Sequence, residues 1–231
     1  MPSAYHRIRY VSSFEELIAT PFENGINALC WPRTLKGDFA EIADLIGPFH
    51  DVATQNEEDL NALTLSPGGR LARQALLADQ ALLQEAGLDP ILDYIPYYPR
   101  DENPGPVPLD VYDFHADSAD IDVDTYLCTY HGASSLGIAN EDAIRYLDIP
   151  EIRQELLALH GGSDDQHFQH HLTENFYDLH YTHNPKPITY SFGLHNLWRI
   201  ATQNPFSKVP PCIHRAPTTD RSSPPRLLLI S

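Results

Sequence analysis

The first part of the chain is patterned mainly for helices. The clearest helix is expected over residues 69–86, where Leu71, Ala75, Ala78 and Leu82 recur at helical spacing and form one apolar face. A glycine directly after this segment is suited to end the helix, because it accepts the left-handed backbone of a helix C-terminus. The pattern therefore predicts a long amphipathic helix that packs on a core.

Two shorter helices and one strand are expected before it. Ser13 with Glu16 gives a capping-box signal for a helix through Ile18, with Ser12 and Glu15 as the alternative pair. Asp38 is placed to cap a second helix. The apolar positions on one face of that second helix are Phe39, Ile42, Leu45 and Ile46. The run INALCWPR (26–33) predicts a buried strand.

The later part of the chain is patterned mainly for strands. Residues 121–130 alternate between the two faces of a strand, with Ile121, Val123, Thr125 and Leu127 on one of them. Further strands are expected at 187–194, 209–215 and 226–231. Asn140 is placed to cap a short helix, and Pro150 to begin a helix that ends at His160. The polar stretch 163–187 is expected to be a loop or lid.

These elements predict one α+β domain over 1–231. Residues 1–90 are expected to form a mainly helical layer, and residues 91–231 a core of strands with a helical or lid insertion at about 140–187. The most economical architecture for such a core is a double-stranded β-helix, or jelly roll, backed by the N-terminal helices.

Composition excludes several classes of partner. The formal net charge of −17 and the isoelectric point near 4.9 argue against nucleic acid and against an anionic membrane surface. The N-terminal residues contain no apolar secretory segment, and the three cysteines follow no pattern, so a reducing cytoplasmic location is expected. The sequence does not indicate an oligomeric state.

Three residues carry the candidate chemistry. His115 and Asp117 stand two apart in YDFHADSAD, and side chains at this spacing on an extended segment point the same way. His214 lies much later, in CIHRAP. Two imidazoles and one carboxylate are the ligand set that holds a non-haem Fe(II) on one face and leaves the other face open. Arg226 follows His214 and opens the last apolar strand, where a guanidinium can bind a carboxylate with two hydrogen bonds. Arg221 is the substitute for this role.

Other clusters are less specific. Six histidines between residues 160 and 183 predict either a mobile lid or a second metal site, and the lid is the better prediction. The alternative for His115 and Asp117 is an ordinary surface pair. Several residues near the triad in sequence are candidates to line a substrate pocket or to pack in the core. These are Tyr126, Tyr130, His131, Trp198 and Arg199.

The run FHAD…CIHRAP…PRLLLIS resembles the H-x-D…H…R signature of the Fe(II)/2-oxoglutarate-dependent dioxygenases, over about residues 110–231. INALCWPR and TYLCTYHGASSLG further resemble an uncharacterised bacterial branch of that superfamily. The resemblance implies iron on His115, Asp117 and His214, and 2-oxoglutarate with its far carboxylate on Arg226. It also implies the release of succinate and CO₂.

The resemblance leaves the substrate open. In halogenating relatives a small residue stands two positions after the first histidine, so Asp117 favours hydroxylation, and a small polar or amino-acid-like substrate is expected. Two alternatives remain. One is a cupin-like metal enzyme that does not use 2-oxoglutarate, with Arg226 structural. The other is a non-catalytic protein that binds a metal or a small molecule.

Overall fold

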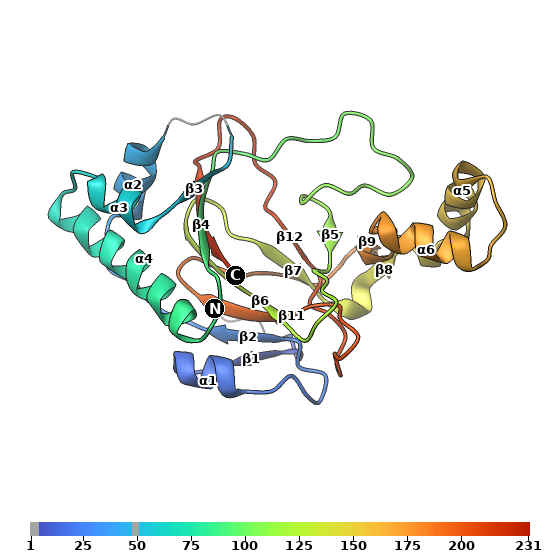
Figure 1. The fold of residues 1–231 in the computed structure, drawn as a ribbon, viewed down its shortest axis with the longest axis horizontal. Helices are drawn as coiled ribbons and strands as arrows, with labels where there is room; N and C mark the ends of the chain where they lie inside the picture. The colour runs from blue at the N-terminus through green and yellow to red at the C-terminus, as the bar shows by residue number, and fades with distance from the viewer. Residues whose placement is uncertain (1–4, 48–50) are drawn as a thin grey trace.

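The computed structural model describes residues 5–47 and 51–231, and it contains two curled β-sheets with helices around them (Figure 1). In spatial order, the seven-stranded sheet contains β1 (Ile8–Tyr10), β2 (Ala28–Trp31), β11 (Leu197–Ala201), β6 (Asp124–His131), β13 (Arg226–Ile230), β4 (Ile91–Ile95) and β3 (Ala53–Gln55). The six-stranded sheet contains β10 (Thr189–Ser191), β7 (Leu136–Ile138), β12 (His214–Arg215), β5 (Phe114–His115), β9 (His180–His183) and β8 (Ala143–Arg145). The predicted α+β class is confirmed.

Local capping signals place the N-terminal helices. They are α1 (Phe14–Ala19), α2 (Phe39–Ile46), α3 (Glu57–Ala62) and α4 (Pro67–Glu85). The Ser13 side chain accepts a hydrogen bond from the Glu16 N–H, and the Asp38 side chain accepts one from the Glu41 N–H, as predicted. Leu45 was expected on the apolar face of α2, but it is 47% exposed.

The N-terminal helices cover one face of the seven-stranded sheet (Figure 1). Buried side chains from α1, α2 and α4 meet side chains from β4, β6, β11 and β13. This cluster includes Phe14, Ile42, Leu76, Leu83, Leu92, Tyr126, Tyr130, Leu197, Leu227 and Leu229. Each large apolar side chain buried here stabilises the fold by about 1.5–3 kcal/mol. Residues 1–90 also supply β1, β2 and β3, so the expected helical layer includes strands at both edges of the sheet.

The opposite face of the seven-stranded sheet packs toward the six-stranded sheet. Strand alternation sends Leu127, Trp198 and Leu228 to this side, where they contact Phe192 and Cys212. The space between the sheets is therefore mostly apolar, and any polar group that enters it is desolvated.

Helices α5 (Pro150–His160) and α6 (Gln166–Glu174) form a separate small layer on the other side of the molecule from α4 (Figure 1). Short 3₁₀ turns surround them: η1 (Asn140–Asp142), η2 (Tyr146–Asp148) and η3 (Tyr177–Leu179). Pro150 begins α5 as predicted, but the helix expected after Asn140 is a 3₁₀ turn followed by β8. None of the helices in the described part of the chain has the length and apolar character needed to cross a membrane.

The stretch 163–187, which was expected to be a loop or lid, is not an irregular loop. This segment contains α6 and then β9, which pairs with β5 on one side and β8 on the other. Several predicted strands are also shorter than expected, including the one over 187–194, of which β10 contains only Thr189–Ser191. β6 begins at Asp124, so that Ile121 is 64% exposed, and β12 contains only the last two residues of 209–215.

A buried ion pair connects α4 with the seven-stranded sheet. Arg33, just after β2, bonds both carboxylate oxygens of Asp79 on α4, with N–O distances of 2.6 and 2.8 Å. The Tyr130 hydroxyl of β6 donates to the same carboxylate at 2.5 Å. The side chains of Arg33 and Asp79 are only 8% and 4% exposed. Removing one partner would leave the other charge buried and uncompensated.

We therefore expect Asp79→Ala to lower the free energy of unfolding by about 3–5 kcal/mol. The matched control is Asp148→Ala, which removes an ion pair with Arg145 whose side chains are 43% and 59% exposed. That change should cost less than about 1 kcal/mol. Urea denaturation followed by circular dichroism measures both, and equal losses would contradict a special role for the buried pair.

Candidate metal centre

The register of two short strands, β5 and β12, brings the two histidines of the triad together. His214 of β12 lies directly opposite His115 of β5, and the centroids of the two imidazoles are 4.8 Å apart. Asp117 lies just beyond the end of β5, and its Oδ1 is 3.8 Å from the Nε2 of each histidine. Potential ligand atoms of the three residues all lie within 4.8 Å of one another. Among the described residues, no other group of three or more histidine, cysteine, aspartate or glutamate side chains lies close enough together to hold a metal ion.

Contacts on the far side of each ring orient the ligand atoms. The Nδ1 of His115 is 2.8 Å from the carbonyl oxygen of Asp113, and the Nδ1 of His214 is 3.4 Å from that of Cys212. A carbonyl oxygen can only accept, so a neutral ring in this position carries its proton on Nδ1 and its lone pair on Nε2. Both Nε2 atoms are thus prepared to bind a metal on the side of Asp117.

The electrostatic surroundings favour the ligand forms of these groups. Burial, together with the neighbouring His214, lowers the pKa of His115 to about 4, so its imidazole is neutral at physiological pH. Burial by itself raises the pKa of Asp117, but His214, the Thr125 hydroxyl and His115 outweigh it, and the net direction is down. A neutral imidazole and an ionised carboxylate are the species that bind divalent metals.

Arg226 enters the space between the sheets as a charge without a carboxylate partner. It lies opposite Ile95 of β4, whose side chain belongs to the core between the sheets. Its side chain is buried, and its Nη2 donates to the Ser135 hydroxyl at 3.1 Å. The Nε is buried with no hydrogen-bond partner, and burial lowers the pKa of the guanidinium. Arg221, in contrast, is exposed and lies over the ring of Tyr97.

Three of the predicted pocket residues lie on the wrong face of the sheet. Tyr126 and Tyr130 alternate with Thr125 along β6, so they point into the core under the N-terminal helices. Arg199 pairs with Asp124 and donates to carbonyl oxygens at the end of α1. The sheet therefore separates these side chains from the triad, and the structure does not bring them to the candidate metal site.

The other two predicted pocket residues do not contact the triad directly. Trp198 faces the space between the sheets and stacks on Phe192, with ring centroids 4.5 Å apart. Phe192 in turn lies 6.1 Å from the ring of His214, so Trp198 supports the site through one intervening side chain. His131 is half-buried at the far end of β6 from Thr125, opposite Leu227.

The histidines of residues 160–183 lie in two different parts of the structure, on the helices α5 and α6 and on strand β9. His160 and His171 stack at 4.8 Å between α5 and α6, and no third metal-binding side chain joins them in the described residues. His180 instead lies on β9, opposite His115, with its ring 5.8 Å away. It is buried, and its Nδ1 has no hydrogen-bond partner. Sequence reasoning missed this position because it treated the segment as a loop, and the four residues HYTH show no clear alternation that would have indicated a strand.

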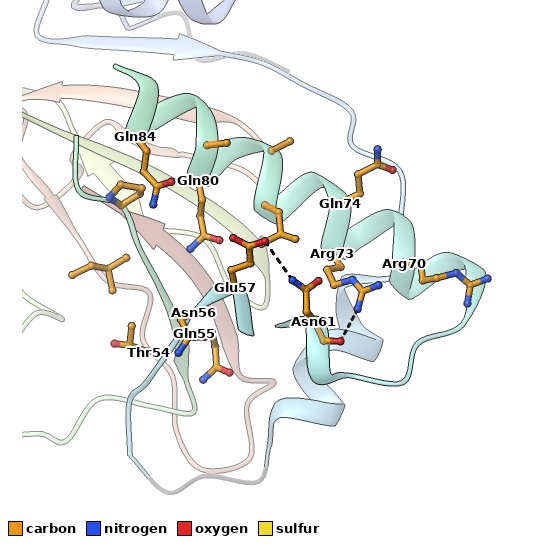
Figure 2. A pocket seen from close by; sticks show the side chains of 15 residues that line it. Thr54, Gln55, Asn56, Glu57, Asn61, Arg70, Arg73, Gln74, Gln80 and Gln84 are labelled. Atoms are coloured by element: carbon orange, nitrogen blue, oxygen red, sulfur yellow. Dashed lines mark hydrogen bonds between the residues drawn. The ribbon is translucent and has the colours of Figure 1, made fainter. Parts of the chain in front are cut away.

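A large cavity lies away from the triad. A hollow of about 840 Å³ separates α3 and α4 from the β3–β4 edge, and Figure 2 shows that carboxamide side chains dominate its wall. Two arginines line this cavity. Arg70 donates a hydrogen bond to the carbonyl oxygen of Leu65, and Arg73 donates to those of Leu60 and Asn61. Both guanidinium groups therefore already have hydrogen-bond partners within the protein. None of the triad lines it, and we assign it no part in the metal centre.

Comparisons of the chain with protein-family models, with curated proteins and with solved structures gave no match. The chemistry must therefore be inferred from the geometry of the site itself. His115, Asp117 and His214 offer two nitrogens and one carboxylate oxygen to one side of an ion. This set suits a divalent transition metal and leaves coordination positions for other ligands.

The metal-free protein should lose stability as the pH falls from about 6.5 to about 4. Burial and the neighbouring His115 lower the pKa of His180 to about 4, whereas its ordinary value is 6.5. In this range the unfolded chain binds a proton that the folded protein does not. His180→Asn should therefore reduce the pH slope of the unfolding free energy by up to about 1.4 kcal/mol per pH unit.

Urea denaturation at several pH values measures this slope. The control is His167→Asn on α6, which makes the same substitution at an exposed histidine. An unchanged slope in His180→Asn would show that His180 titrates like an exposed histidine.

Proposed function

We propose that this protein is an Fe(II)- and 2-oxoglutarate-dependent oxygenase that hydroxylates a small polar, amino-acid-like molecule. The observation that carries the proposal is the pairing of the triad with Arg226. Three metal-binding side chains and one buried guanidinium without a carboxylate partner both face the space between the sheets. A buried charge is costly unless an opposite charge joins it, so an anionic ligand is the natural partner of Arg226.

The strand order supports a jelly-roll core for this function. Strands β4, β6, β11 and β13 are neighbours in one sheet, and β5, β12, β7 and β10 are neighbours in the other. The chain thus changes sheet at every step from β4 to β13 except between β7 and β10, and the pairs among these strands are antiparallel. Eight strands in two antiparallel sheets are the elements of a jelly roll.

Each side chain would have a separate task. His115, Asp117 and His214 would hold the iron through Nε2, Oδ1 and Nε2. Arg226 would bind the far carboxylate of 2-oxoglutarate, with the Ser135 hydroxyl beside it. When bound, iron and 2-oxoglutarate supply the oxidising chemistry, which consumes O₂ and releases succinate and CO₂. An apolar core lies beside the site, between the two sheets.

The direct test is the binding and turnover of 2-oxoglutarate. Under anaerobic conditions, Fe(II) and 2-oxoglutarate together should give a visible charge-transfer band. In air the protein should convert 2-oxoglutarate slowly to succinate, and His115→Ala should abolish both signals because it removes an iron ligand. His167→Ala is the matched histidine control. Turnover retained in His115→Ala would refute the assignment, and full iron binding without 2-oxoglutarate binding would favour the cupin-like alternative.

A second prediction separates Arg226 from Arg221. Loss of one or two charge-assisted hydrogen bonds, worth about 1.5–3 kcal/mol each, should make Arg226→Met bind 2-oxoglutarate on the order of 100-fold more weakly. Because the same change removes an uncompensated buried charge, the ligand-free protein should be equally stable or more stable.

Arg221→Met serves as the control and should leave the affinity within about twofold, because this side chain is exposed and charge-assisted bonds at the surface contribute little. Calorimetric titration of the iron-loaded protein measures the affinities, and thermal unfolding measures the stabilities. Equal affinity losses in the two variants would contradict the choice of Arg226.

A further inference from the structure

The two oxygens of the Asp117 carboxylate have different surroundings. Oδ2 accepts a hydrogen bond from the Thr125 hydroxyl at 2.6 Å. Oδ1 has no such donor but lies 3.8 Å from the Nε2 atoms of both His115 and His214. One oxygen is therefore held by Thr125, and the other faces the position that the triad defines.

This hydrogen bond joins the two sheets. Asp117 follows β5 of the six-stranded sheet, whereas Thr125 lies on β6 of the seven-stranded sheet. The backbone of the aspartate segment is also fixed, because the Gln203 N–H donates to the Asp117 carbonyl at 2.7 Å and the Ala116 N–H donates to Leu179 at 3.0 Å. These bonds do not set the plane of the carboxylate, since the last torsion of an aspartate side chain is soft. Thr125 supplies the contact that sets it.

We propose that Thr125 is a positioning residue that limits Asp117 to binding the metal through Oδ1 alone; this inference rests on the proposed function. A carboxylate can bind a metal through one oxygen or through both. With one oxygen, the triad fills three of the six positions of an octahedral ion, and three remain. A bidentate 2-oxoglutarate needs two of them and O₂ needs the third. Binding through both oxygens of Asp117 would fill one of these positions.

A purely structural role for Thr125 makes different predictions. Thr125 is half-buried in the middle of the pairing between β6 and β11, opposite Ile200, where any β-branched residue suits the strand. Thr125→Val keeps the branched shape and removes only the hydroxyl. Thr125→Ser keeps the hydroxyl and removes the methyl group. If the residue acts only as part of the strand, valine is the better substitute; if it positions Asp117, serine is.

The test is a titration of the metal-free wild type and both variants with Co(II), without 2-oxoglutarate. Loss of an outer contact to a metal ligand typically weakens metal binding by about 10- to 100-fold. We expect this loss for Thr125→Val, with a changed visible Co(II) spectrum that reports the altered coordination. We expect Thr125→Ser to stay within about threefold of the wild type, because it retains the hydrogen bond. Thermal unfolding of the metal-free proteins verifies that both variants are folded.

Each outcome has one meaning. Wild-type affinity and spectrum in Thr125→Val would overturn the positioning role while leaving the proposed function intact. No Co(II) binding by the wild type would refute the metal centre and the inference with it. If Thr125→Val does not fold, the structure of the metal-loaded wild type decides. Asp117 bound through one oxygen, with the other on Thr125, supports the inference, and a bidentate Asp117 refutes it.

Discussion

The pairing of β5 with β12 is the constraint on which the candidate centre depends. Each strand is only two residues long, and their shared register places His115 opposite His214. Such short strands gain little from their own hydrogen bonds, so neighbours must hold them. β7 supports the register with Gly137, which lies opposite His214, and a Cβ at this position would fall 2.2 Å from the ring of Tyr190. The glycine lets the Tyr190 ring cover this strand, and the stack continues to Phe192 beside His214.

The buried side chains of Arg33 and Arg226 differ in the partners of their charge. Arg33 is neutralised by Asp79 with two hydrogen bonds, which is what a structural charge requires. Arg226 is at least as deeply buried, yet it meets only neutral groups and leaves its Nε without a partner. Both side chains are desolvated, so burial does not explain the difference. An anion that binds and leaves would explain it, since a permanent carboxylate at Arg226 would compete with the ligand.

Sequence reasoning succeeded where the determining interactions are local. Ser13, Asp38 and Pro150 begin helices through contacts within one turn, and a sequence displays such contacts directly. The spacing of His115 and Asp117 is local in the same sense. The two faces of β6 were harder to assign. Alternation separates Tyr126 from Thr125, but only the packing of the N-terminal helices decides which of them faces the triad. β9 was missed because its pairing with β5 is a tertiary contact.

The proposed site requires both sheets at once. The six-stranded sheet supplies His115 and His214, with Asp117 beside them, and the seven-stranded sheet supplies Arg226 and Thr125. The distance between the triad and the guanidinium is thus set by the packing of one sheet on the other, which includes the contact of Phe192 with Trp198. A close-packed core transmits small shifts instead of absorbing them. Under the proposed function, the length of dicarboxylate that fits between the triad and Arg226 would therefore depend on the apolar core between the sheets as well as on the residues that touch the ligand.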